Sequence, residues 1–355
     1  MLTCVKTALG KTEMLDLPVP EPAPGEVVIK TSMATICGSD MHFLDELPNE
    51  VLAATFPTMM RPEGLPTGHE GVGHIHAVGA GVTSFKEGDR VIASCLTACG
   101  RCHSCMNGDY GICTSLSPFG SPLFGCQAEY FAVRDAETSV AHVPDSVSDE
   151  NALLASDIMS AGFSGIERAN AQIGDSVAIF AQGPLGLCTT VCARIRGCGL
   201  IVGVDTIPER LEMAKKLGAN VVINPQEKDP VAEIMSLTKM EGVDIAVEAV
   251  GTQPTFEAST RVVRRGGVVS SIGIYSQVPQ LSMPTLIPSF HHRTIVTTIC
   301  PAGRERMEHL LALLEHGTVD LGDLFTHRMK ISEVPQAYDL FRSKADGVLK
   351  IALTP

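Results

Sequence analysis

The sequence predicts an α/β protein in which a mostly β domain is followed by a doubly wound parallel sheet with helices on both faces. Two patterns in the 355 residues carry this prediction. Before about residue 150, short β-type runs are separated by Gly and Pro, and after it short buried-strand runs alternate with helical periods. Length is a third observation, because chains of more than ~250 residues usually divide their hydrophobic cores.

The first half is expected to form a compact, mostly β unit with barrel-like closure, because its runs are short and bounded by turn residues. The expected strands are Glu26–Lys30, Gly71–Val78, Arg90–Ser94 and Glu129–Val133.

The second half is expected to consist of repeated βαβ units, which produce a parallel sheet of about six strands. The expected strands are Ser176–Ala181, Leu200–Val204, Val221–Ile223, Val243–Val250, Gly267–Ile272 and Thr294–Ile299. The helices expected between them are Leu185–Arg196, Pro208–Leu217, Pro230–Lys239 and Thr255–Arg264.

After Cys300 the pattern changes again, and we expect this last segment to return to the first domain. It is expected to contain a helix at Arg304–Glu315 and strands at Phe325–Lys330 and Leu349–Leu353. The predicted domains are therefore 1–157, 158–300 and the return 301–355.

Charge and composition restrict the class of partner. The 27 Lys and Arg against 40 Asp and Glu give a net charge of −13, which argues against nucleic acid or an anionic membrane as a general partner. No apolar run approaches the ~18 residues of a membrane span. The first residues, Met1–Glu13, are interrupted by charged side chains, so we expect no secretory signal. Twelve cysteines in such a chain indicate a reducing compartment, and a cytoplasmic protein is expected.

Four cysteines form the clearest motif of the chain. They follow the pattern C-x2-C-x2-C-x7-C, which is typical of a closed tetrahedral Zn²⁺ site with a structural role. The four are Cys99, Cys102, Cys105 and Cys113. The other cysteines outside the predicted ligand sets are expected to be core or pocket-wall residues, and these are Cys4, Cys95, Cys126, Cys188, Cys192, Cys198 and Cys300.

A nucleotide-binding turn is expected after the strand Ser176–Ala181. The segment resembles G-x-G-x-x-G, with Ala181 at the first glycine position and with Gly183, Pro184, Leu185 and Gly186 opening the next helix. Such a turn brings backbone amides and a helix N-terminus close to a pyrophosphate, as in Rossmann domains.

A carboxylate strengthens this interpretation and indicates which dinucleotide binds. Asp205 ends the following strand, where it would accept hydrogen bonds from the ribose hydroxyls and repel a 2′-phosphate, so NAD is favoured over NADP. Arg210 is either a second group near the ribose, which would weaken that preference, or a surface residue of the helix. Val250 and Ile272, at the ends of two further strands, are the other candidate cofactor contacts in this domain.

The order of these motifs resembles the zinc-dependent medium-chain alcohol dehydrogenases. The resemblance rests on Cys37-x-Ser39-Asp40-x-His42, on Gly68-His69-Glu70 with the glycines that follow it, on the four-cysteine segment and on the nucleotide-binding turn. It covers essentially the whole chain and implies a GroES-like catalytic domain followed by a Rossmann domain.

The resemblance implies a second Zn²⁺, bound by Cys37, His69 and a third ligand for which the sequence offers Asp157. Asp at this position is similar to the microbial secondary-alcohol dehydrogenase branch, and Glu70 is an alternative or additional ligand. From its residue type alone, Asp157 is also well suited to cap a helix N-terminus.

The resemblance also implies a proton path in which Ser39 passes the alcohol proton through the nicotinamide ribose hydroxyl to His42, which the residue types allow. Their other interpretations are a turn cap for Ser39 and a solvated surface position for His42. Asp40 is expected to orient this loop by hydrogen bonding. Lys350 either reaches the pyrophosphate or is a solvated residue at a strand end.

The expected activity is the interconversion of a small neutral secondary alcohol and its ketone, with NAD and two zinc ions per subunit. Activity on a polyol, butanediol or threonine is the first alternative; a zinc-free reductase and a non-catalytic binding protein on the same fold are others. Ile299, Cys300 and Leu116–Leu123 are candidate pocket walls, and Leu47–Leu65 is an unusually long loop. A homo-oligomer is expected, a tetramer or else a dimer, with the strand Thr294–Ile299 as a pairing edge.

Overall fold

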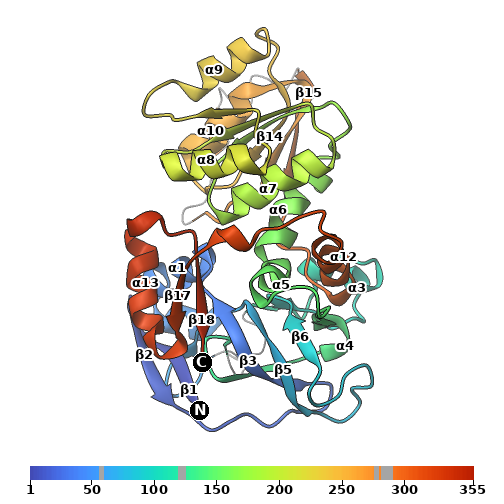
Figure 1. Ribbon diagram of the computed structural model, residues 1–355, viewed down its shortest axis with the longest axis vertical. Coiled ribbons are helices and arrows are strands. Elements are labelled where there is room, and N and C mark those ends of the chain that lie inside the picture. Colours follow the sequence, from blue (N-terminus) through green and yellow to red (C-terminus); the bar gives the residue numbers. More distant parts are fainter. Residues whose placement is uncertain (56–59, 119–124, 276–279, 281–290) are drawn as a thin grey trace. The chain divides into compact units, whose positions relative to one another are not determined.

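The computed structural model describes residues 1–55, 60–118, 125–275, 280 and 291–355. It divides into two compact units. Unit 1 comprises Met1–Ser160 and Cys300–Pro355, and unit 2 comprises Ala161–Ile299. The α/β class is confirmed, with a mainly β unit and a parallel-sheet unit (Figure 1).

Unit 1 is built on a seven-stranded sheet and a smaller three-stranded one. The large sheet has the order β10 (Val140–His142), β6 (Arg90–Ala93), β5 (Gly71–Val78), β3 (Val27–Thr35), β18 (Lys350–Thr354) and β17 (Phe325–Lys330), and β9 (Tyr130–Val133) also pairs with β3. The small sheet has the order β2 (Lys11–Asp16), β1 (Leu2–Ala8) and β4 (Leu65–Pro66). Strands β7 (Leu96–Thr97) and β8 (Ser117–Pro118) form a two-stranded pair.

Strand β3 continues five residues beyond the predicted end at Lys30 and leads directly to the first zinc-ligand candidate. The sequence pattern fails there because the strand contains register shifts near Ile29 and Met33, which interrupt the alternation of apolar residues. Thr31, within this irregular part, is buried and donates its hydroxyl to Ala128 O at 2.6 Å. β3 therefore leads to Cys37, two residues after its end, at a partly buried position of the unit.

The end of the chain belongs to unit 1. β18 pairs antiparallel with β3, with Ala352 opposite Thr35 and Leu353 opposite Ala34, and it pairs parallel with β17 (Figure 1). This register continues toward Cys37 on one strand and Lys350 on the other. Lys350, at the start of the last strand, therefore lies beside the segment that leads to Cys37.

The helices of unit 1 are short, apart from those that follow residue 148 and those in the last segment of the chain. They are α1 (Gly38–Met41), a π-helical turn (His42–Glu46), α2 (Asn49–Thr55), α3 (His103–Met106), α4 (Ala136–Ser139), α5 (Asp149–Ser156), α12 (Arg304–Glu315) and α13 (Val334–Ser343), with 3₁₀ turns at Tyr110–Ile112, Gly322–Leu324, Ile331–Glu333 and Ala345–Gly347. The segment Leu47–Leu65, predicted as a long loop, contains the helix α2, and its residues 56–59 lie outside the described residues. In the described part of the chain, no helix is both long and apolar enough to cross a membrane.

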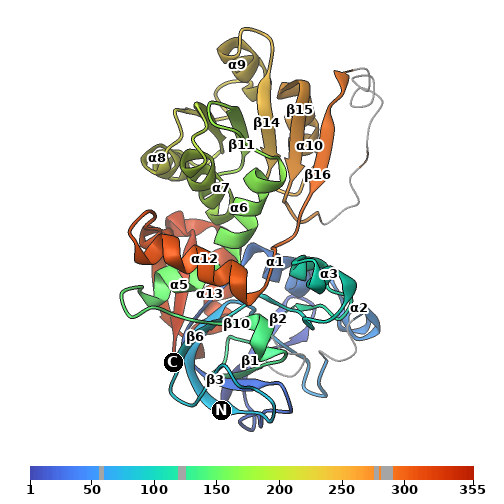
Figure 2. The same ribbon diagram turned by 90° about the vertical axis from the view of Figure 1, so that its right-hand side faces the viewer.

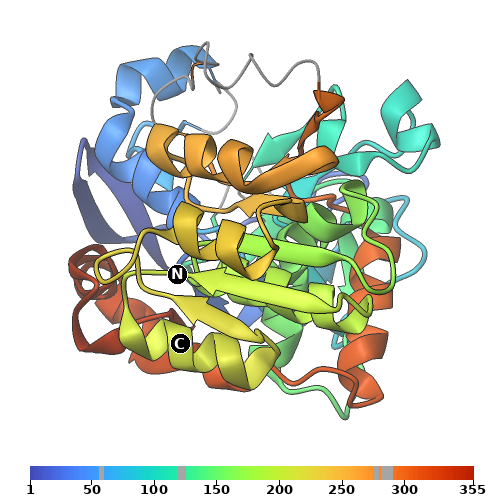
Figure 3. The same cartoon turned by 90° about the horizontal axis from the view of Figure 1, so that it is seen from above.

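Unit 2 contains one parallel sheet, and the predicted six strands are confirmed. Its order is β13 (Val221–Ile223), β12 (Leu200–Val204), β11 (Ser176–Phe180), β14 (Val243–Glu248), β15 (Val263–Ser271) and β16 (Thr294–Thr297). Helix α6 (Ile158–Arg168) leads into the unit, α7 (Pro184–Ile195) packs with α8 (Pro208–Leu217), and α9 (Pro230–Leu237) packs with α10 (Gln253–Val262). The two helix pairs lie on opposite faces of the sheet (Figures 2 and 3).

This topology identifies where a nucleotide would bind. The strand order reverses between β11 and β14, and in open α/β sheets ligands bind at the carboxyl ends of the strands at such a reversal. Three helices of the unit begin with Pro, namely α7, α8 and α9. Pro suits this position because the backbone amides of the first turn have no partner within the helix, and Pro has no amide hydrogen to leave unpaired.

Two strands of the parallel sheet end two residues before their predicted ends. β14 ends at Glu248 instead of Val250, because the Glu248 carboxylate accepts the Val250 and Gly251 amides at 2.9 Å and so turns the chain out of the sheet. β16 ends at Thr297, two residues before Ile299. Residues 119–123 of the predicted wall Leu116–Leu123 lie outside the described residues.

Candidate metal centres and nucleotide-binding turn

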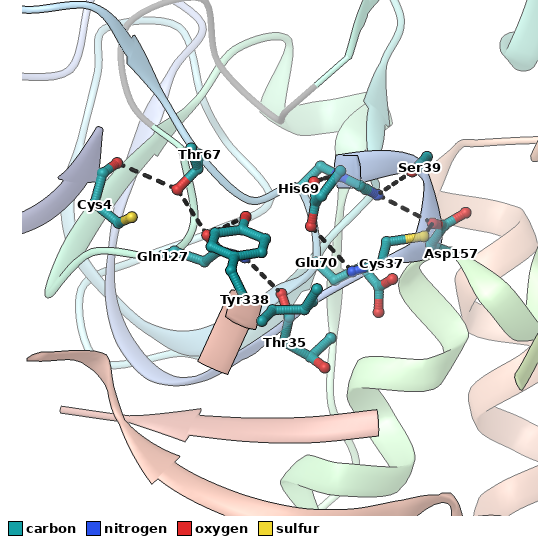
Figure 4. A network of polar contacts seen from close by, with 12 residues as sticks. Cys4, Thr35, Cys37, Ser39, Thr67, His69, Glu70, Gln127, Asp157 and Tyr338 are labelled. Carbon is teal, nitrogen blue, oxygen red and sulfur yellow. Dashed lines mark hydrogen bonds and ion pairs between the residues drawn. The ribbon is translucent and has the colours of Figure 1, made fainter. Parts of the chain in front are cut away.

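The structure brings Cys37, His69 and Asp157 together inside unit 1 (Figure 4). Cys37 follows β3, His69 precedes β5, and Asp157 lies between α5 and α6. Asp157 Oδ2 is 3.4 Å from Cys37 Sγ and 3.3 Å from His69 Nε2. The candidate ligand atoms of these residues and of Glu70 all lie within 4.8 Å of one another.

The chemistry of this donor set fits Zn²⁺. Thiolate, imidazole and carboxylate are the three ligand types that zinc binds in proteins, and three protein ligands with one open position is the usual catalytic arrangement. Burial, with the charges of Asp157 and Glu70, raises the pKa of the Cys37 thiol to about 11. Burial alone would raise the pKa of Asp157 as well, but the hydrogen bond and charge of His69 lower it to about 2. A bound cation would replace the proton on the thiol.

Asp40 holds two of the three candidate ligands in place. Its Oδ2 accepts the backbone amide of Cys37 at 3.0 Å, and its Oδ1 lies 3.0 Å from His69 Nδ1. The first contact matches the expectation that Asp40 orients this loop. The second contact occupies Nδ1 and leaves His69 Nε2 as the atom directed at the metal position. Carboxylates commonly orient metal-binding histidines in this way.

Glu70 is paired with Lys350. The Lys350 ammonium donates to both Glu70 carboxylate oxygens, at 2.8 and 2.6 Å, and to Ile36 O at 3.2 Å. Both side chains are 1% exposed. Neither expectation for Lys350, a pyrophosphate contact or a solvated strand end, is correct, because pairing of β18 with β3 buries it.

Ser39 and His42 lie on the short helical segment that follows Cys37. Ser39 Oγ is 3.4 Å from His69 Nε2, at the ligand cluster (Figure 4). His42 begins the π-helical turn, where its side chain is 26% exposed and its Nδ1 is 3.1 Å from Glu46 Oε1. Single π-turns inside helices occur frequently at functional sites. One residue of the predicted pair is therefore at the cluster, and the other has access to solvent.

The four cysteines of the C-x2-C-x2-C-x7-C motif also converge. Sulfur-to-sulfur distances are 3.5 Å for Cys102 and Cys105, 3.9 Å for Cys102 and Cys113, and 3.6 Å for Cys113 and Cys99. Backbone amides of Cys105 and Thr114 lower the pKa of Cys102 to about 5. Amides directed at sulfur favour the thiolate, which is the form that binds zinc.

In unit 2, the turn after β11 has the shape of a phosphate-binding loop. Gly183 caps the N-terminus of α7, Pro184 and Leu185 open the helix, and a Cβ at Gly186 would lie 2.0 Å from Ala181 O. Ala181 itself has φ +89°, in the left-handed region that favours glycine. The turn therefore has the glycine-type backbone expected for dinucleotide binding, and Ala181 adopts it with strain.

Asp205 stabilises this turn through two hydrogen bonds. Its Oδ2 accepts the Gln182 amide at 2.7 Å and its Oδ1 accepts the Ile207 amide at 3.0 Å. Arg210 is close by, since its Nη1 is 3.5 Å from where a Cβ on Gly183 would lie. Arg210 therefore lies at the helix N-terminus and is not confined to the solvent face of its helix.

Of the two remaining cofactor candidates in unit 2, Val250 is 42% exposed and Ile272 is 7% exposed. Sequence reasoning missed Glu248, the fully buried carboxylate two residues before Val250. Besides the two amides after β14, it accepts the hydroxyl of Thr255 at 2.7 Å and that of Tyr275 at 2.8 Å. The signal that could have identified it is a Glu inside the apolar run Val243–Val250.

Sequence reasoning also missed Gln127, which is fully buried and connects the two ligand-bearing segments (Figure 4). Its Nε2 donates to Thr35 O at 3.1 Å, two residues before Cys37. Its Oε1 accepts the Thr67 hydroxyl at 2.7 Å, two residues before His69. Tyr338 of α13 donates to the same oxygen at 2.6 Å. No motif in the sequence indicates this residue, because its role depends on long-range contacts.

A β unit with two zinc-type ligand clusters, together with a parallel-sheet unit that contains a dinucleotide turn, defines the class of zinc-binding dehydrogenases. Two protein-family models match the chain in the same order. The alcohol dehydrogenase GroES-like domain matches residues 23–145, and the zinc-binding dehydrogenase family matches residues 184–316.

Known proteins agree with this class. An alcohol dehydrogenase of Cupriavidus necator is 41% identical, over 98% of this chain and 96% of the relative. An NADP-dependent isopropanol dehydrogenase of Thermoanaerobacter brockii is 30% identical over 97% and 96%, and a sorbitol dehydrogenase of Bacillus subtilis is 33% identical over 96% and 93%. Among solved structures, the alcohol dehydrogenase TADH from Thermus sp. ATN1 superposes with a TM-score of 0.89 at 30% identity, covering 100% of this chain and 99% of the other.

The chain therefore belongs to the zinc-dependent medium-chain alcohol dehydrogenase family. It is a zinc-dependent alcohol oxidoreductase with a GroES-like unit and a Rossmann unit.

Proposed function

We propose that this protein interconverts neutral secondary alcohols and ketones by hydride transfer to and from NAD. The observation that carries the proposal is the position of Asp157, whose carboxylate lies within 3.4 Å of Cys37 Sγ and His69 Nε2 as the third member of a Cys-His-Asp set. The similarity to an isopropanol dehydrogenase supports a secondary alcohol as substrate.

In this proposal, Cys37, His69 and Asp157 hold the catalytic zinc. The bound ion would supply Lewis acidity that lowers the pKa of the alcohol oxygen. Asp40 keeps the imidazole of His69 turned toward the ion, and Lys350 keeps the Glu70 carboxylate engaged so that a position stays open for substrate.

Proton release is assigned to Ser39 and His42. Ser39, at the ligand cluster, accepts the hydroxyl proton of the alcohol as it gives up its own hydroxyl proton, and His42, partly exposed on the next helical turn, delivers the released proton to solvent. Histidine suits this role because its unperturbed pKa lies near physiological pH.

The choice of NAD rests on Asp205. Its buried carboxylate, held by two backbone amides at the end of β12, would face the adenosine ribose and repel a 2′-phosphate. Arg210 lies at the same helix N-terminus and opposes this preference, so measurable activity with NADP is expected as well.

The test is NADH formation by the zinc-loaded protein with 2-butanol, beside ethanol, sorbitol, 2,3-butanediol and threonine, repeated with NADP⁺. Fastest turnover of 2-butanol with NAD⁺ is expected, and Asp157→Asn should abolish it while leaving the four-cysteine zinc in place. A matched control is Asp149→Asn, a carboxylate of α5 that contacts Ser32 and Arg90 instead. Activity confined to a polyol or threonine would replace the secondary-alcohol assignment.

We further propose a homo-oligomer in a reducing compartment such as the cytoplasm. Among the described strands, β16 ends the six-stranded sheet, and its Ile295 is 43% exposed, which suits pairing with a second copy. None of the twelve cysteines is in a disulfide, as a reducing compartment would keep them. Light scattering should give the mass of a tetramer or dimer, and Ile295→Lys should lower it; a monomeric wild type would refute the proposal.

A further inference from the structure

Asp157 belongs to a second group of metal-ligating side chains besides the one already described. Cys95 Sγ, Cys300 Sγ and a carboxylate oxygen of Asp157 all lie within 4.8 Å of one another. Cys95 is 3% exposed and Cys300 is 4% exposed, so both residues are buried. In the proposed reaction neither cysteine has a role.

Hydrogen bonds hold the three segments of this group together. The Cys95 amide donates to Ser156 O at 3.3 Å, and Cys300 Sγ lies 3.7 Å from the backbone oxygen of Asp157. The amide of Gly303, three residues after Cys300, donates to Ser94 Oγ at 3.3 Å. The fold therefore fixes the three chain segments that carry the two thiols and the carboxylate beside one another.

The ligand types of this group select a particular class of ion. Two thiolates and a carboxylate suit a thiophilic divalent cation such as Cd²⁺ or Zn²⁺, with water in the fourth position, and do not suit Mg²⁺ or Ca²⁺, which take oxygen ligands. Two buried thiols alone would be consistent with a hydrophobic wall. The carboxylate of Asp157 beside them makes the set a ligand cluster.

We propose that Cys95, Cys300 and Asp157 form an inhibitory site for Cd²⁺ or excess Zn²⁺. Binding breaks two S–H bonds, forms two sulfur–metal bonds and releases two protons to solvent. The cation takes the carboxylate of Asp157 and leaves the catalytic zinc on Cys37 and His69, so it binds in addition to the two zinc ions and disturbs the catalytic arrangement. Occupancy of the site does not depend on the proposed function; only its effect on turnover does.

The test measures metal first and activity second. Zinc-loaded protein is incubated with Cd²⁺ or added Zn²⁺ and desalted, and bound metal per chain is measured by elemental mass spectrometry, with ultraviolet absorption reporting cadmium–thiolate bonds. Wild type should bind one equivalent more than the two zinc sites account for. Cys95→Ser and Cys300→Ser should each lose that equivalent and keep the zinc of the four-cysteine site. Cys192→Ala, a buried cysteine of unit 2, is the matched control and should keep it.

Activity on 2-butanol should fall with added Cd²⁺ in the wild type and be at least tenfold less sensitive in the two serine variants. Anomalous scattering from wild-type crystals soaked in Cd²⁺ gives an independent result if a variant fails to fold, and a peak between Cys95 and Cys300 is expected. No additional equivalent in the wild type, an equivalent that persists in both serine variants, or a peak elsewhere would each overturn the proposal. An inactive protein that still binds the ion at these cysteines would refute the proposed function alone.

Discussion

Lys350 and Glu70 form a fully buried ion pair in which the ammonium contacts both carboxylate oxygens, at 2.8 and 2.6 Å. The residues are 280 positions apart in the sequence, and the contact connects the last strand of the chain to the segment that contains His69. A buried pair gives modest net stability, because desolvation offsets the attraction, but removing one partner leaves an isolated buried charge. The pair therefore makes the geometry of the catalytic cluster depend on the C-terminal strand.

The first prediction concerns this pair. Lys350→Met should lower the free energy of unfolding by about 3–5 kcal/mol, because Glu70 then remains as an uncompensated buried charge. Activity should fall as well, since the freed carboxylate can move into the position kept open for substrate. Urea unfolding and kcat on 2-butanol are the measurements.

The control for this prediction is the double variant Lys350→Met, Glu70→Leu, which removes both charges. It should recover most of the lost stability, because no buried charge is left unpaired. Equal instability of the single and double variants would show that packing of β18, and not the ion pair, determines the effect.

The second prediction concerns Gln127, whose side-chain amide joins Thr35 to Thr67. Gln127→Met, which keeps the volume and removes the hydrogen bonds, should weaken zinc at Cys37 and His69 by about tenfold, the lower end of the effect of groups that orient metal ligands. Chelator titration of both zinc ions and the visible spectrum of a Co²⁺-substituted catalytic site are the measurements.

Tyr338→Phe removes one hydrogen bond to the same amide and leaves the links to Thr35 and Thr67. It should change metal affinity less than Gln127→Met does. The four-cysteine zinc should be unaffected in both variants. Equal weakening of both zinc sites would indicate general destabilisation and contradict a positioning role.

The features that can be predicted from the sequence are those that short-range interactions determine. The six-strand sheet and helices such as Pro208–Leu217 were predictable, because hydrophobic periodicity and N-terminal Pro are local signals. The four-cysteine cluster was predictable for the same reason, since all its ligands lie within fifteen residues.

Long-range pairing determined what the sequence did not predict. The sequence alone assigns Lys350 to solvent or to a phosphate, because nothing near it in the chain shows that β18 pairs with β3. Gln127 and Glu248 were missed because a lone buried polar residue gains its meaning only from partners in distant segments. Cys95 and Cys300 were assigned to core or wall, and only the fold places both beside Asp157.

The third prediction concerns backbone strain at the nucleotide turn. Ala181→Gly should stabilise unit 2 by about 1 kcal/mol, because φ +89° is strained for Ala and the greater freedom of Gly in the unfolded chain offsets part of the gain. Gly186→Ala should do the opposite and abolish NADH binding, because its Cβ would lie 2.0 Å from Ala181 O. Thermal unfolding and NADH fluorescence titration are the measurements.

A neutral effect of Gly186→Ala on NADH binding would mean that the turn relaxes easily, and the phosphate-loop interpretation would then lose its steric basis. Gly317→Ala, at a glycine with φ +68° that has open space around its Cβ position, is the control for the cost of backbone conformation alone. It should affect stability without affecting NADH binding.

The fourth prediction concerns the pH dependence of stability. Glu137 accepts the amides of Thr83 and Ser84 at 2.6 and 2.9 Å, and its other oxygen lies 3.7 Å from Arg304 of α12. Burial alone would raise the pKa of Glu137, but these hydrogen bonds lower it from 4.5 to about 2. Since the folded pKa lies below the unfolded one, the contribution of this carboxylate is complete above pH 4.5 and is lost as pH falls toward 2.

Glu137→Gln should therefore destabilise the protein at pH 7 and flatten the decline in stability between pH 4.5 and 2 relative to wild type. Unfolding temperatures measured across this window test the expectation, with Glu21→Gln, at an exposed position, as the control. The control should follow the wild-type profile. If Glu137→Gln follows the wild-type profile too, other carboxylates determine the acid sensitivity, and the contact between α4 and the Thr83–Ser84 turn contributes nothing to it.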